Sequence, residues 1–71
     1  MSKTIHPLLT VLRRHQVEIR TGLARSSIYA LIAKGQFPAP IRLSAHTVGW
    51  LEHEINGWIE NRIKATRVVT A

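Results

Sequence analysis

The chain contains no cysteine and no apolar run long enough to cross a membrane. Without cysteine it can form neither a disulfide framework nor a cysteine-based zinc site, and it fits an intracellular compartment. A membrane helix needs roughly 18 consecutive apolar residues. The apolar residues between Leu8 and Leu12 are too few and too interrupted for a secretory signal. We therefore expect a cytoplasmic protein with no membrane association.

Acidic residues are also scarce, and their positions are uneven. The sequence has 4 Asp and Glu against 10 Lys and Arg, which gives a net charge of +6. Between residues 13 and 42 Glu18 is the only acid, whereas Glu52, Glu54 and Glu60 all come later. A compact basic domain points to polyanionic partners, nucleic acid before anionic membrane. The alternative is a surface charged only for solubility, which the uneven distribution makes the weaker interpretation.

With 71 residues the chain has room for one domain. A folded chain of this length buries only about 60% of its unfolded surface, so an enclosed catalytic pocket of about 300 Å³ or more is not expected. The 45% apolar composition still predicts a folded protein. Because the sequence shows no nucleophile with a neighbouring base and no glycine-rich phosphate loop, we expect neither an enzyme nor a bound cofactor.

Four histidines, His6, His15, His46 and His53, raise the question of a metal site. No two of them have the i, i+3 or i, i+4 spacing that places two imidazoles on one helical face, so we predict no metal ligands. Glu52 and Glu54 are close together where a helix is predicted to start, a position that favours negative charge. These two carboxylates need no acid-base role.

The sequence predicts three helices. The first covers about residues 14–20 and ends at Gly22, and the second spans residues 24–34 and ends at Gly35. The last helix runs from about residue 52 to residue 65. The first two, joined by a tight turn, are typical of a helix-turn-helix.

The predicted helices are amphipathic. The second helix has a stripe of apolar residues expected to face the core: Ala24, Ile28, Leu31 and Ile32. The last helix has a similar stripe: Ile55, Trp58, Ile59 and Arg62/Ile63. The outward face of the second helix then holds small, polar and basic residues: Arg25, Ser26, Tyr29, Ala30 and Ala33.

After the second helix, Pro38 and Pro40 exclude further helix and keep the chain extended. Residues 41–50 then alternate on either side of a short turn, which predicts a small hairpin, or wing. Residues 8–12 are apolar enough to pack as a short strand or an extended lead-in.

The predicted fold is mostly α with one small β-hairpin, a winged helix-turn-helix. It occupies residues 8–65, with a flexible tail at residues 1–7 and a flexible end at residues 66–71.

The second helix is the candidate for insertion into a DNA major groove, which is about 12 Å wide. Arg25 is the best candidate for contact with a guanine edge or a phosphate. Ser26 and Ser27 lie near the helix start, where free N–H groups and the helix dipole favour a phosphate. Tyr29 could donate to a phosphate or stack on a sugar or base. Alternatively, Arg25 and Tyr29 only cover apolar surface.

Further candidate contacts surround this helix: Arg14, Arg20, Lys34, Arg42 and His46. Arg42 on the wing could reach the flanking backbone or a narrow minor groove, or it could be a solvated strand charge. Lys34 is either a phosphate contact or a helix cap. Arg14, with Arg13 beside it, could grip phosphate or could serve only as surface.

Three motifs stand between residues 17 and 63: Thr21-Gly22-Leu23-Ala24-Arg25-Ser26-Ser27-Ile28-Tyr29, Gly35-Gln36-Phe37-Pro38, and the spaced tryptophans Trp50 and Trp58. A chance match to all three is improbable. In this region, about two-thirds of the chain, the sequence resembles the AlpA family of small phage and genomic-island regulators.

The resemblance implies a MerR-like winged helix that binds double-stranded DNA, with residues 24–34 in the major groove and the wing at residues 41–50 on the flanking backbone or minor groove. It implies a bacterial or phage-derived, nucleoid-associated protein. Such a protein activates an integrase or excision gene, or acts as an excisionase that bends DNA and orients a tyrosine recombinase. Because one such domain buries only about 600–1,000 Å² on DNA, several copies are expected to associate on adjacent repeats.

Three positions depart from the family pattern. Ala24 replaces the usual serine at the N-cap of the second helix, at a cost of about 1 kcal/mol. His46 stands on the wing where the family commonly has arginine. Because histidine loses its charge near about pH 6.5, contact between this wing and phosphate is expected to weaken as pH rises. Arg14 occupies a position that is usually apolar.

Two other classes of function stay open. In the first, the protein is an interaction module that binds an integrase or repressor through the acidic last helix, with Glu52, Glu54 and Glu60 as the contact surface. In the second it binds RNA, although Tyr29 is the only aromatic residue expected to be exposed for base stacking.

Overall fold

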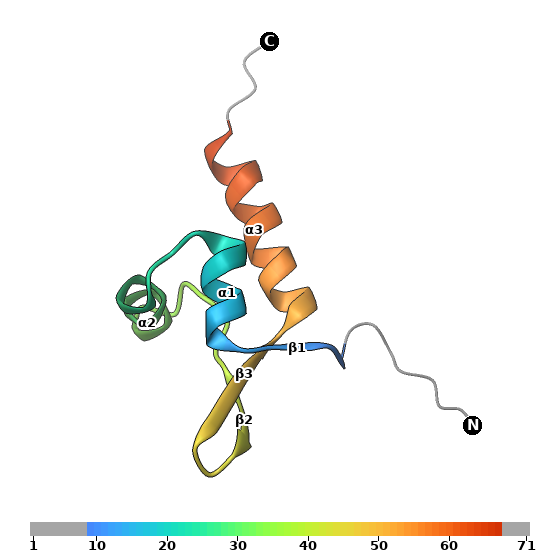
Figure 1. Ribbon diagram of the computed structural model, residues 1–71. Coiled ribbons are helices and arrows are strands. Elements are labelled where there is room, and N and C mark those ends of the chain that lie inside the picture. The colour runs from blue at the N-terminus through green and yellow to red at the C-terminus, as the bar shows by residue number, and fades with distance from the viewer. Residues whose placement is uncertain (1–8, 68–71) are drawn as a thin grey trace, which may run out of the picture.

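The computed structural model describes residues 9–67 (Figure 1). The elements in chain order are β1 (Val11–Leu12), α1 (Arg14–Thr21), α2 (Arg25–Ala33), β2 (Ile41–Ser44), β3 (Thr47–Leu51) and α3 (Glu52–Thr66). The β2–β3 hairpin and α3 extend from the body in opposite directions (Figure 1). The winged helix-like architecture predicted from the sequence is therefore confirmed. The predicted tail at residues 1–7 lies outside the described residues, as do residues 68–71 of the predicted end at residues 66–71, and Thr66 is the last residue of α3.

A three-residue turn joins α1 to α2. Gly22 has a left-handed backbone, with φ of 74°, and its N–H donates to the Glu18 carbonyl at 2.8 Å. Glycine adopts this conformation without steric cost. The Thr21 hydroxyl donates to the Val17 carbonyl at 2.8 Å and accepts from the Leu23 N–H at 3.2 Å. Backbone and side-chain bonds thus both fix the angle between the two helices.

The end of α2 is closed by a Schellman motif. The N–H of Gly35 donates to the Ile32 carbonyl at 3.0 Å, and the N–H of Gln36 donates to the Leu31 carbonyl at 2.9 Å. Gly35 has the left-handed φ of 72° that the motif requires. The chain therefore leaves α2 sharply and runs back toward α3 through the proline segment.

The core takes one buried side chain from nearly every part of the described chain: Leu12, Val17, Ile28, Phe37, Trp50 and Ile55. Trp50 on β3 is fully buried, and its indole N–H donates to the Pro38 carbonyl at 2.9 Å. This bond satisfies the only polar atom of the indole ring and ties the wing to the proline segment.

Two residues of the predicted apolar stripes do not face the core. Ala24 is exposed because it is the N-cap of α2, outside the helical turns that pack on the core. Ile63 is 44% exposed because the residues of α3 that pack on the core end at Ile59.

The sheet is antiparallel, with strand order β1-β3-β2. Val11 pairs with Leu51 on one side of β3, and Ile41 pairs with Gly49 on the other. A Cβ atom at Gly49 would lie 2.5 Å from Val11 Cγ1, so a larger residue at position 49 would have to displace the Val11 side chain of β1. β2 does not show the predicted alternation of inward and outward residues, because every residue of this edge strand is exposed.

Candidate nucleic-acid interface

The outward face of α2 is largely exposed. Ile28 is fully buried, whereas Arg25, Ser26, Ala30 and Ala33 are exposed and Tyr29 is 38% exposed. This face has two alanines and one serine beside Arg25 and Tyr29. Its low profile lets the helix backbone approach another surface closely.

Arg25 is held by a chain of ring contacts that leads to the core. Its guanidinium carbon lies 6.0 Å from the centroid of the Tyr29 ring. Tyr29 in turn packs edge-on against Trp50, with centroids 6.4 Å apart and an interplanar angle of 64°. Because Trp50 is buried and hydrogen-bonded, the two exposed side chains rest on a fixed base.

The start of α2 carries no negative charge. Its N-cap Ala24 provides no side-chain hydrogen bond, and its first turn contains no acidic residue. The first N–H groups of any α-helix lack partners within the helix, and the helix dipole is positive at this end. Arg25, Ser26 and Ser27 occupy these positions, so the helix start combines a cation, hydroxyls and open N–H groups that can receive an anion.

The wing presents a second basic group. Arg42 Nη1 donates to the Ala45 carbonyl at 3.0 Å, so the guanidinium lies along the hairpin turn. Other N–H groups of the same guanidinium can still reach a ligand. His46 follows in the turn and is exposed.

The start of α1 and the wing border one hollow of about 350 Å³, lined by Arg13, Arg14, His15, Tyr29, His46 and Val48. Arg14 Nε pairs with Glu18 Oε2 at 3.0 Å, four residues further along the helix. The Arg13 backbone N–H donates to the Gln16 side chain at 2.9 Å, which leaves the Arg13 side chain out of the cap. Four of these residues, Arg13, Arg14, Tyr29 and His46, are candidate DNA contacts from the sequence, which contains no sign that they share one site.

Lys34 and Arg20 are among the predicted contact residues that do not line this hollow. Lys34 is exposed at the C-terminal cap of α2. Arg20 pairs with Glu52 of α3 at 2.8 Å and donates to Asn56 Oδ1 at 3.4 Å. Its charge is therefore offset by an acid of the same chain, and its geometry ties α1 to α3.

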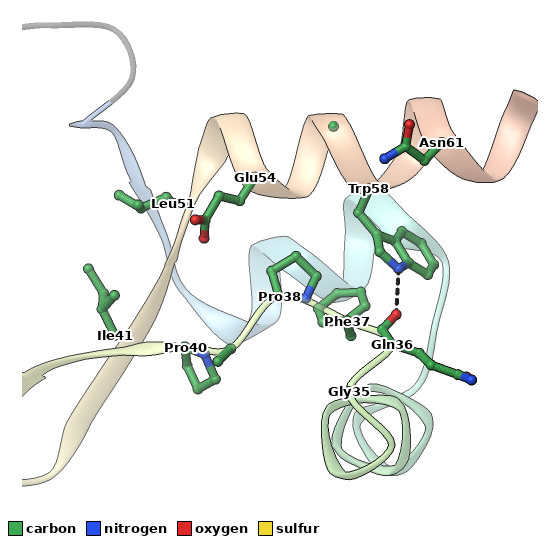
Figure 2. A pocket seen from close by; sticks show the side chains of 12 residues that line it. Gly35, Gln36, Phe37, Pro38, Pro40, Ile41, Leu51, Glu54, Trp58 and Asn61 are labelled. Carbon is green, nitrogen blue, oxygen red and sulfur yellow. Dashed lines mark hydrogen bonds between the residues drawn. The ribbon is translucent and has the colours of Figure 1, made fainter.

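A different surface, which sequence reasoning missed, is an open groove of about 700 Å³ between α3 and residues 35–41 (Figure 2). Phe37 and Trp58 meet edge-on with centroids 4.8 Å apart, and the Trp58 indole N–H donates to the Gln36 carbonyl at 2.8 Å. Glu54 extends from α3 toward the proline segment (Figure 2). The signal available in the sequence was an extended Phe-Pro-Ala-Pro segment with an aromatic partner on the last helix.

Within residues 9–67, no three histidine or acidic side chains are grouped closely enough to hold a metal ion. In the same range no helix has the length and apolar character needed to span a bilayer.

Comparison with known proteins places the chain in a family. Residues 10–63 match the family model described as "Prophage CP4-57 regulatory protein (AlpA)". The chain is 35% identical over 60 residues to the "DNA-binding transcriptional activator AlpA" of Escherichia coli K12, covering 76% of this chain and 86% of that protein. It is 44% identical over 52 residues to "Uncharacterized protein ORF88" of Enterobacteria phage P4, covering 73% of this chain and 59% of the phage protein. From the extent of the family match, the chain belongs to the AlpA family of prophage regulatory proteins.

Proposed function

We propose that the protein is a sequence-specific DNA-binding regulator of prophage or genomic-island genes. The observation that carries the proposal is the exposed face of α2, where Arg25 rests on Tyr29 beside a helix start without acids. The similarity to a protein named as a DNA-binding transcriptional activator supports it. The function assigned is binding, with no catalytic chemistry.

In the proposed complex α2 enters the major groove. Arg25 reads a guanine edge, because a guanidinium can donate to guanine O6 and N7 together. Ser26 and Ser27 bind a phosphate at the helix start, and Tyr29 donates to the backbone from its hydroxyl. Lys34 provides a further phosphate contact at the other end of the helix.

The wing and α1 act outside the major groove in this arrangement. Arg42 and His46 bind the flanking backbone or minor groove, and Arg14 binds phosphate from the start of α1. Arg14 and Arg20 contribute less than the other cations, because Glu18 and Glu52 already offset their charges.

We propose an excisionase role on the same basis, in which several copies bind neighbouring repeats and orient a tyrosine recombinase. The test is binding to a tiled library of the surrounding genomic DNA at about 50 and about 200 mM salt, with the footprint and bend of each hit. Repeated, bent sites in a recombination attachment region would support the excisionase role. A single site at an integrase-like promoter would support transcriptional regulation alone. Binding that is uniform across the library would count against sequence-specific function.

The groove beside α3 favours a second candidate function, docking of a protein partner such as an integrase or repressor. Glu54 lines this groove and Glu60 is exposed further along α3, whereas Glu52 is paired with Arg20. Charge reversal by Glu54→Lys should then abolish partner binding and leave DNA binding intact. Unchanged partner binding by Glu54→Lys would eliminate this surface.

A further inference from the structure

The hollow between α1 and the wing contains both histidines of the helix-turn-helix and hairpin, His15 and His46. They come from elements 31 positions apart in the sequence, yet they line the same space of about 350 Å³. Both side chains belong to exposed residues, so solvent and ligands can reach them.

The charged groups around the hollow are nearly all positive. At the start of α1 they are the N-cap Arg13, then Arg14 and His15, with Glu18 as the carboxylate paired to Arg14. The neighbouring groups on α2 are Arg25 and Tyr29, and those on the hairpin are Arg42 and His46. With neutral imidazoles the hollow already favours an anion. Protonation adds a charge and a donor at each histidine.

We propose that this hollow binds one phosphodiester group of the DNA backbone, and that its two histidines make affinity for duplex DNA rise as pH falls. The inference rests on the proposed DNA-binding function and adds its regulation by pH. The hollow borders Tyr29 of α2, so in the proposed complex the backbone of a duplex seated on α2 would lie within reach of the hollow.

The direction of the effect follows from linkage. A bound phosphate stabilises the protonated form of each imidazole, so the complex binds more protons than the free protein does. Affinity therefore rises as pH falls through the range in which histidine titrates, between about pH 8 and about pH 5. The effect requires no change in the contacts of Arg25 with bases.

The test is the affinity for a short duplex of random sequence, followed by fluorescence anisotropy from about pH 8 to about pH 5.5. The proteins compared are the wild type, His15→Asn, His46→Asn, the double variant, and His53→Asn as a histidine control outside the hollow. We expect the wild type and His53→Asn to bind about tenfold more tightly at the lower pH. Each single variant should lose part of this gain, and the double variant most of it.

Two further readouts separate phosphate binding from a general change in charge. The salt dependence of wild-type affinity should steepen at low pH, by about 0.9 in the slope of log K for each added phosphate contact. In NMR spectra of the wild type at the lower pH, adding duplex should shift the imidazole resonances of His15 and His46 and leave those of His53 in place.

A double variant that retains the full pH dependence, or imidazole resonances of His15 and His46 that duplex does not shift, would overturn the inference. These results would leave DNA binding itself intact. By contrast, a wild-type protein that binds no duplex at any pH would overturn the proposed function as well.

Discussion

The starts of α2 and α3 are similar helix ends that differ in the charge of their first turns. Both N-caps, Ala24 and Leu51, lack a side-chain hydrogen bond to the helix. The first turn of α3 contains Glu52 and Glu54, whereas the first turn of α2 contains no acid and begins with Arg25. The positive end of the helix dipole is therefore offset within the protein at α3 and left open at α2.

This difference separates a structural helix end from one available to a ligand. Glu52 also pairs with Arg20 of α1, so the start of α3 is joined to its neighbour. At α2 the missing cap costs about 1 kcal/mol of stability, and the missing acids forgo about 0.3–1 kcal/mol each. A phosphate at the start of α2 would recover part of this free energy on binding. The free protein is thus less stable at the helix end where the proposed phosphate would bind and stabilise it.

The largest effect is expected from removing the cation at the start of α2. Arg25→Ala should cost about 1–3 kcal/mol of discrimination between the preferred duplex and random sequence, because the bidentate base contact is lost. Competition binding measures this ratio directly. Arg42→Ala is the matched comparison: it should weaken binding to all sequences similarly, with a salt slope smaller by about 0.9. Equal losses on both duplexes for Arg25→Ala would refute its role in base reading.

Giving α2 the charge pattern of α3 should have the next largest effect. Ser27→Glu places a carboxylate where a phosphate is expected, so affinity for duplex should fall about tenfold, or about 1.4 kcal/mol. Thermal stability should hold or rise, because the new acid favours the helix dipole. Asn61→Glu adds the same charge at an exposed position of α3 and should change affinity far less. Comparable losses of duplex affinity in the two variants would mean that net charge alone causes the effect.

Restoring the missing N-cap of α2 tests the comparison by its effect on the stability of the fold. Ala24→Ser should raise the free energy of unfolding by about 1 kcal/mol, because the hydroxyl accepts from an N–H of the first turn. Urea denaturation monitored by circular dichroism measures the change. Ala33→Ser, at the other end of the same exposed face, should instead lower stability by about 0.5 kcal/mol through helix propensity. If both serines had the same effect, capping would not explain the gain.

The smallest effect is expected at the start of α3. Glu52→Gln removes the ion pair with Arg20. The side chains of Arg20 and Glu52 are 39% and 27% exposed. Such pairs contribute less than about 1 kcal/mol, so the unfolding midpoint should fall slightly and duplex affinity should not fall. A clear loss of affinity in this variant would show that the start of α3 participates in DNA binding.

Local signals in the sequence were enough to place the helices. The prediction of residues 14–20, 24–34 and 52–65 lies within one residue of each observed boundary. Gly22 and Gly35 mark the exits of α1 and α2 because each takes a left-handed backbone, and the prolines after Gly35 prevent the helix from continuing. The exposed face of α2 followed from its apolar spacing in the same way.

Contacts between distant segments could not be read from the sequence. The pairing of β1 with β3 depends on Gly49 meeting Val11, and the Arg20–Glu52 pair joins residues 32 positions apart. The hollow that unites His15 with His46 depends on α1 packing against β3 of the wing. Spacing rules apply within one helix or strand, and they contain no information on such tertiary neighbours.

The most direct test of the contrast between the two helix starts is the change in backbone amide NMR shifts on adding a preferred duplex. We expect the largest changes at residues 25–28 and in the wing at residues 42–46, with small changes at residues 52–55. Larger changes at residues 52–55 than at residues 25–28 would contradict the assignment of α2 as the helix that meets DNA.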